Sequence, residues 1–135
     1  MSIGSWDPEA ADHSTPFEFD NGLLAEIIAL GQNAGYAEIA QIIPQDQLQK
    51  QSRMMTLGKE AWFQKAEDYN EADIIQLIRF FTLAEMKLPG WEAGAESPVV
   101  WLVKVLRKRG TPPDRDLLLW IKTNTTNKFL PNGAL

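Results

Sequence analysis

The stretch that decides the fold is NEADIIQLIRFFTLAEMK, residues 70–87. Asn70 can cap a helix, and the acidic Glu71 and Asp73 suit the positive end of the helix dipole. Apolar side chains follow at helical spacing: Ile74, Leu77, Ile78 and Phe81 form one stripe, and Ile75, Phe80, Leu83 and Met86 widen it. A helix that is apolar on most sides belongs in the middle of a fold. Pro89 and Gly90 then end this helix.

Three helical segments are expected before this central helix. Asp20 and Asn21 cap the first, whose apolar side is formed by Leu23, Leu24, Ile27 and Ile28. The second covers Tyr36–Ile43, and Pro44 either ends it or opens the next. The third runs through residues 45–69, where Leu48, Met55, Trp62 and Tyr69 recur every seven residues and Gly58 breaks the helix in two.

Two more helices are expected after the central one. Ser97 and Pro98 form a cap followed by proline at the first helical position, and Gly110 stands where that helix should stop. Asp114 then starts the last helix, and residues 124–135 are predicted to form a partly ordered tail.

These patterns predict an all-α fold. Strand-like alternation is absent, and the connections between the expected helices are short. We therefore predict a compact bundle of about five to seven short antiparallel helices, with armadillo- or HEAT-like hairpins as one arrangement. Residues 1–19 are predicted to be a flexible acidic arm, and residues 20–135 a single helical domain.

The charge is distributed unevenly along the chain. The net charge is -5, yet residues 1–49 contain eight Asp or Glu and no Lys or Arg. Residues 99–135 contain seven Lys or Arg and two Asp. The acidic beginning and the basic end could attract each other within one molecule or between copies, and such contacts would weaken with salt.

Composition also bounds the cellular setting. The chain has no cysteine, which excludes disulfides, thiolate nucleophiles and cysteine-ligated metal. Its first residues lack the basic and apolar regions of a signal peptide, and no apolar run reaches membrane-spanning length. These features predict a soluble, cytoplasmic protein without a membrane partner.

Few residues point to catalysis or to a cofactor. The one histidine, His13, lies in the expected flexible arm, which offers no fixed geometry for a metal. No nucleophile motif surrounds any serine, so we predict no catalytic residue, no metal site and no cofactor. The densest group of carboxylates is Glu67, Asp68, Glu71 and Asp73, which suits a solvated helix start or the wall of a pocket.

Aromatic and basic side chains are the candidates for partner binding. Trp6 and Trp91 fall in an expected arm and loop, where a large aromatic either covers the core or anchors a partner. The basic candidates are Lys104, Arg107, Lys108, Arg109 and Arg115, with Trp101, Trp120 and Phe129 nearby in sequence. Cations can contact phosphates while rings stack on bases, although Lys and Arg near a helix end also suit the helix dipole.

Three stretches of the C-terminal half carry a resemblance: FTLAEMKLPGW at 81–91, SPVVWLVKVLRKRG at 97–110 and WIKTNTTNKFLPNG at 120–133. They resemble segments of a family of small, uncharacterised bacterial all-helical proteins. The resemblance implies no activity and no functional residue.

The leading prediction is a non-enzymatic helical module that binds another protein or a second copy of itself. The first alternative is a nucleic-acid-binding domain that uses the basic C-terminal helices, with Lys122 added to the residues named above. The second alternative is a small-ligand protein or enzyme with a pocket between helices, built from the carboxylates at 67–73.

Overall fold

The computed structural model describes residues 17–32 and 39–132. Every regular element in these ranges is helical: α2 (Asn21–Gln32), α3 (Ile39–Ile42), α4 (Leu48–Gln51), α5 (Lys59–Ala66), α6 (Glu71–Lys87), α7 (Pro98–Lys108) and α8 (Arg115–Asn124), with 3₁₀ turns at Gln45–Gln47, Ser52–Thr56 and Gly94–Glu96. The predicted all-α compact bundle is confirmed. The antiparallel, armadillo- or HEAT-like arrangement stays a prediction.

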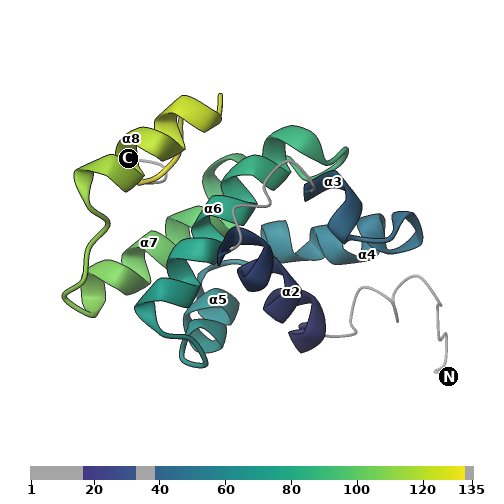
Figure 1. Ribbon diagram of the computed structural model, residues 1–135, viewed down its shortest axis with the longest axis horizontal. Coiled ribbons are helices and arrows are strands. Elements are labelled where there is room, and N and C mark those ends of the chain that lie inside the picture. The colour runs from purple at the N-terminus through teal and green to yellow at the C-terminus, as the bar shows by residue number, and fades with distance from the viewer. Residues whose placement is uncertain (1–16, 33–38, 133–135) are drawn as a thin grey trace, which may run out of the picture.

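Helix α6 is the central element, as its sequence predicts. It contacts α2, α3, α7 and α8, and Figure 1 shows it in the middle of the molecule, with α8 on one side and α3 and α4 on the other. The Asn70 side chain accepts a hydrogen bond from the Asp73 backbone N–H at 2.8 Å, which confirms the cap. The expectation for Met86 was wrong: this side chain is 46% exposed, because it lies on the solvent side near the helix end.

The caps of the last two helices are also confirmed. Ser97 accepts a hydrogen bond from the Val99 backbone N–H, and Pro98 occupies the first position of α7. Asp114 accepts one from the Leu117 backbone N–H at 2.8 Å. Gly110 follows the end of α7 with a φ of +78°, a left-handed conformation that favours glycine.

Residues 45–58 differ from the expected helix. They form two 3₁₀ turns around the four-residue α4, and α5 begins only after Gly58. The tight second turn places the adjacent Met54 and Met55 in the core, whereas the seven-residue spacing had singled out only Met55. The Trp62 indole N–H then donates to the Met54 carbonyl at 2.9 Å and fixes this turn against α5. Gly58 does break the helix, with a φ of +95°.

The described part of the expected N-terminal arm packs against the core. The Phe19 ring lies 4.9 Å from the Trp62 ring, and Phe17 lies 5.5 Å from Phe19, both edge to face. Residues 1–16, with Trp6 and His13, lie outside the described residues. So do residues 33–38, which hold the expected start of the helix at Tyr36; α3 is described from Ile39.

The described part of the predicted tail, residues 125–132, packs against the rest of the fold. Leu130 is 3% exposed, and the Asn127 side chain donates to the Glu85 carboxylate of α6. Because these contacts join residues that are far apart in the sequence, no local sequence pattern could predict them.

Within residues 17–32 and 39–132, no helix combines the length and apolar character needed to cross a membrane.

Candidate functional site

Helix α5 presents different side chains to its two neighbours. Trp62 and Ala66 are buried in the core. Lys59 and Phe63 lie on the flank that faces α7, while Lys65 lies on the flank that faces α2. The four-residue spacing of each pair follows from the helical repeat, so the burial of Trp62 and Ala66 decides which charged side chains meet which helix.

The flank toward α7 forms a groove of about 480 Å³. We call it the basic groove; its lining residues are Lys59 and Phe63 from α5 and Trp101, Lys104, Arg107 and Lys108 from α7. Both walls belong to helices that pack against each other. The side chains therefore project from rigid backbone, and no carboxylate lies among them.

The charges of the basic groove are not neutralised by ion pairs. None of its four cations forms an ion pair with a described residue. The ammonium groups of Lys108 and Lys59 instead lie 4.7 and 5.7 Å from the centre of the Phe63 ring. Since a ring face attracts cations but does not cancel their charge, the groove keeps a positive field that suits an anionic ligand.

The structure places the seven residues predicted to bind a partner in different surroundings. Lys104, Arg107 and Lys108 share the basic groove, whereas Arg109 and Arg115 do not line it. Trp91 is fully buried, and its indole N–H donates to the Leu48 carbonyl at 3.1 Å. Of the two roles considered for Trp91, it therefore has that of covering the core and is not exposed for a partner. Trp6 lies outside the described residues.

Sequence reasoning missed Lys59 and Phe63 as groove residues. The available signal was their separation of four residues within a helical segment, which places them on one side of it. That spacing says nothing about which other helix lies opposite. Lys59 and Lys104 line the same groove only because α5 packs against α7.

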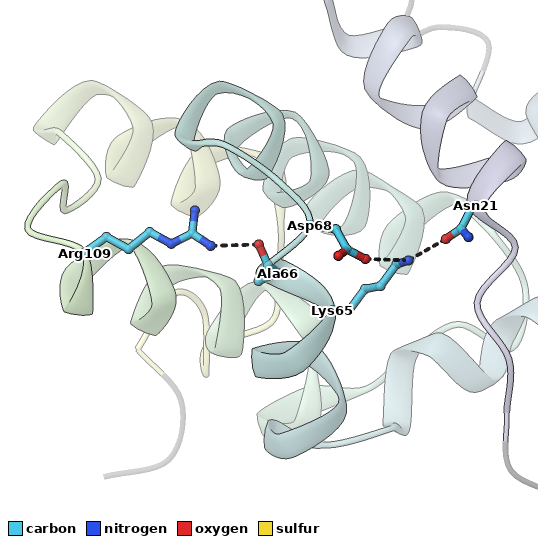
Figure 2. A network of polar contacts seen from close by, with 5 residues as sticks. All are labelled: Asn21, Lys65, Ala66, Asp68 and Arg109. Atoms are coloured by element: carbon cyan, nitrogen blue, oxygen red, sulfur yellow. Dashed lines mark hydrogen bonds and ion pairs between the residues drawn. The ribbon is translucent and has the colours of Figure 1, made fainter.

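Arg109 has a structural role at the end of α5. Its guanidinium donates to the Ala66 carbonyl and to the Tyr69 carbonyl, both at 2.7 Å. Figure 2 shows the side chain reaching from the end of α7 to the Ala66 carbonyl. The last carbonyls of a helix have no partner within that helix. The Ala66 carbonyl also accepts the Tyr69 backbone N–H at 3.0 Å, so Arg109 adds a second donor there and supplies a donor to the Tyr69 carbonyl.

Replacing Arg109 with alanine should lower the free energy of unfolding by about 1–2 kcal/mol, because two charge-assisted hydrogen bonds are lost at a partly exposed site. Arg109→Lys should recover less than half of this, since one ammonium cannot reproduce the guanidinium fork. Urea denaturation measures the change, with the exposed Arg115→Ala as the matched control. If the Arg109→Ala and Arg115→Ala variants were equally stable, the structural role of Arg109 would be contradicted.

The opposite flank of α5 borders a second, open pocket of about 460 Å³ between α2 and the turn into α6. Two of the four clustered carboxylates, Asp68 and Asp73, line it, whereas Glu67 and Glu71 do not. Lys65 hydrogen-bonds Asn21 of α2 and forms an ion pair with Asp68 at 3.2 Å (Figure 2). These contacts tie the start of α2 to α5.

Tyr69 also lines this second pocket. Burial raises the pKa of its phenol above the ordinary value, and the negative charges of Asp68 and Asp73 add to the effect. The phenol is therefore neutral at physiological pH and can donate a hydrogen bond.

Among residues 17–32 and 39–132, no three His, Asp or Glu side chains gather as a metal site would require.

Compared with known proteins, the chain matches no family model, no curated protein and no solved structure. The fold and the site therefore describe the class of this protein by its architecture alone. It is an all-helical protein with a basic groove between two packed helices.

Proposed function

We propose that this protein is a non-enzymatic interaction module whose basic groove binds an acidic segment of a partner protein. The observation that carries the proposal is the set of four cations around one groove, none of them in an ion pair with a described residue. Aspartate and glutamate side chains of a short segment would supply the missing charges, and each new pair would be strengthened by its hydrogen bonds.

The size of the groove limits how much of the partner it holds. A volume of about 480 Å³ is that of a small-ligand site. The groove therefore contacts a few consecutive side chains, and the rest of the partner lies on the surrounding surface. A module of this kind gives specificity through charge placement more than through buried area.

Two features favour a protein segment over a nucleic acid. Single-stranded nucleic acids bind by stacking bases on free aromatic faces. Here the Phe63 ring already faces the ammonium groups of Lys59 and Lys108, which leaves less of it for a base. The whole chain also carries a net charge of -5, whereas nucleic-acid-binding domains are usually basic.

The test compares two fluorescent probes in anisotropy titrations of the full chain at physiological salt: a ten-residue peptide rich in glutamate and a ten-nucleotide oligothymidine. We expect the peptide to bind more tightly. The double variant Lys104→Glu/Lys108→Glu should weaken peptide binding by about tenfold or more, since it removes two pairing cations and adds repulsion.

The matched control is the double variant Arg115→Glu/Lys122→Glu. It makes the same change in net charge at exposed residues outside the basic groove, so peptide affinity should change by less than about twofold. Equal losses in the two double variants would show a diffuse charge effect and contradict the proposal. Tighter binding of oligothymidine, lost with Lys104 and Lys108, would assign the groove to nucleic acid instead.

A further inference from the structure

The first described residues pack on the helix that forms one wall of the basic groove. The Phe19 ring lies 4.9 Å from the Trp62 ring of α5. The centre of the Phe17 ring lies 5.5 Å from the guanidinium of Arg53. Arg53 belongs to the 3₁₀ turn Ser52–Thr56, which contacts α7. The chain is therefore held close to the α5–α7 pair before it enters α2.

Residues 6–12, with the sequence WDPEAAD, carry the charge that the basic groove lacks. We call them the N-terminal acidic segment; they precede the described residues and contain Asp7, Glu9 and Asp12 but no Lys or Arg. The groove has four cations and no carboxylate in its lining, and none of these cations forms an ion pair with a described residue. The segment and the groove are therefore complementary in charge.

The length of the chain allows the two to meet within one molecule. Asp12 stands five residues before Phe17, and Asp7 stands ten residues before it. An extended chain spans about 3.3 Å per residue, so these two residues can lie up to about 17 and 33 Å from Phe17. Phe19 and the groove lie on different flanks of α5, and a helix with its side chains is about 10–12 Å across. The groove is therefore within reach of the segment.

We infer that the N-terminal acidic segment binds in the basic groove of its own molecule and competes there with the acidic segment of a partner. The carboxylates of Asp7, Glu9 and Asp12 would pair with the groove cations through charge-assisted hydrogen bonds. The inference rests on the proposed function, because both acidic segments use the same cations. It adds a regulatory contact, since a partner must displace the chain's own segment.

A weak contact is sufficient because the two sites belong to one chain. A segment on a short linker has an effective concentration of about millimolar. A contact with a Kd of about 1 mM between separate molecules is then filled about half of the time. A second copy would have to reach a similar concentration to compete, which favours the segment of the same molecule.

Paramagnetic relaxation enhancement in the full chain tests the contact. The sequence has no cysteine, so Ala10→Cys provides a single attachment point for a nitroxide label within the N-terminal acidic segment. The backbone amide signals of Lys104 and Lys108 should lose about half of their intensity or more relative to the reduced label. The signal of Ile121, in α8 and outside the groove, should keep its intensity. Absence of a loss at Lys104 and Lys108 would overturn the inference.

Two charge-reversal variants assign the loss to the basic groove. Lys104→Glu/Lys108→Glu should remove it, because two groove cations become anions. Arg115→Glu/Lys122→Glu makes the same change in net charge outside the groove and should preserve it. Equal effects of the two double variants would overturn the inference.

A mixed sample separates a contact within one molecule from a contact between copies. It contains equal parts of ¹⁵N-labelled chain without the nitroxide and unlabelled chain with it. We expect no loss of intensity at the groove in this sample. A loss as large as that in the single-chain sample would assign the groove to the segment of a second copy and overturn the inference.

The glutamate-rich peptide tests the competition. The triple variant Asp7→Asn/Glu9→Gln/Asp12→Asn should bind this peptide about twofold or more tightly than the unchanged chain, because the groove is no longer filled about half of the time. The matched control makes the same change in net charge at exposed residues outside the groove and should change the affinity by less than about 1.3-fold. This control is Asp46→Asn/Glu92→Gln/Asp116→Asn. Equal affinities of the two triple variants would overturn the competition.

The two readouts separate this inference from the proposed function, because the nitroxide experiment uses no peptide. A chain that binds the peptide without a loss of intensity at the groove would overturn the inference and leave the proposed function standing. A chain that shows the loss but does not bind the peptide would support the contact within the chain and contradict the proposed function.

Discussion

Replacing Glu85 with alanine should lower the free energy of unfolding by about 3–5 kcal/mol. Glu85 is 7% exposed on α6, and its Oε2 accepts the backbone N–H groups of Ala93 at 2.7 Å and Gly94 at 3.0 Å. Its Oε1 accepts the Asn127 side-chain amide at 2.9 Å. One carboxylate thus joins the central helix to the loop before α7 and to the segment after α8.

The expected loss is large because alanine leaves several donors without an acceptor. Two partly buried backbone N–H groups lose their partners, and the Asn127 amide keeps only its bond to the Gly94 carbonyl at 2.9 Å. Glu85→Gln should lose about 2 kcal/mol, because its carbonyl oxygen preserves part of the network while its NH₂ group faces other donors.

Chemical denaturation of both variants measures these losses, with Glu92→Ala as the matched control. Glu92 is an exposed carboxylate close by in the loop, and its removal should change stability by less than about 0.5 kcal/mol. If Glu85→Ala were as mild as Glu92→Ala, the carboxylate would not hold these segments together. A double-mutant cycle with Asn127→Ala gives the energy of that one contact.

Trp91→Ala should be at least as damaging, with an expected loss of about 4–5 kcal/mol. The Trp91 side chain is completely buried, its ring lies 6.4 Å from that of Phe80, and its indole N–H donates to the Leu48 carbonyl. Alanine would leave a large cavity, and the Leu48 carbonyl would keep only its hydrogen bond from the Ser52 backbone N–H. Trp91→Phe should lose about 2 kcal/mol, because it restores much of the volume without the donor.

The same denaturation experiment separates a core role for Trp91 from a partner-anchoring role. The control is Leu119→Ala, since Leu119 is 50% exposed and its removal should change stability by less than about 0.5 kcal/mol. A Trp91→Ala protein of unchanged stability would contradict the burial and return this residue to the set of partner contacts.

The helices were largely predictable because their signals are local. Asn70, Ser97 and Asp114 cap helices through bonds to N–H groups two or three residues away. The apolar stripe of α6 is buried as its spacing predicts. The prediction was wrong at residues 45–58, where a regular seven-residue spacing suggested a helix but the chain forms 3₁₀ turns. It was also wrong for Met86, because the exposure of this side chain depends on what packs beside the end of α6.

The candidate sites were predictable only in part. Lys104, Arg107 and Lys108 stand close together in the sequence, and they do share a groove. Arg109 belongs to the same basic run, yet its guanidinium binds carbonyls 40 and 43 residues earlier in the chain. A run of like charges shows that a helix end is basic, but it does not separate a side chain that binds the protein from one that remains accessible.

The sequence by itself determined the all-helical class, the caps and the central place of residues 71–87, because helix formation depends on groups within about four residues of each other. Only the tertiary structure decided that Lys59 and Phe63 face α7, that Trp91 is buried, and that Glu85 meets Asn127 across 42 residues of chain. These outcomes depend on which helices pack together, and that choice is made by the fit of whole apolar faces, which no short stretch of sequence contains.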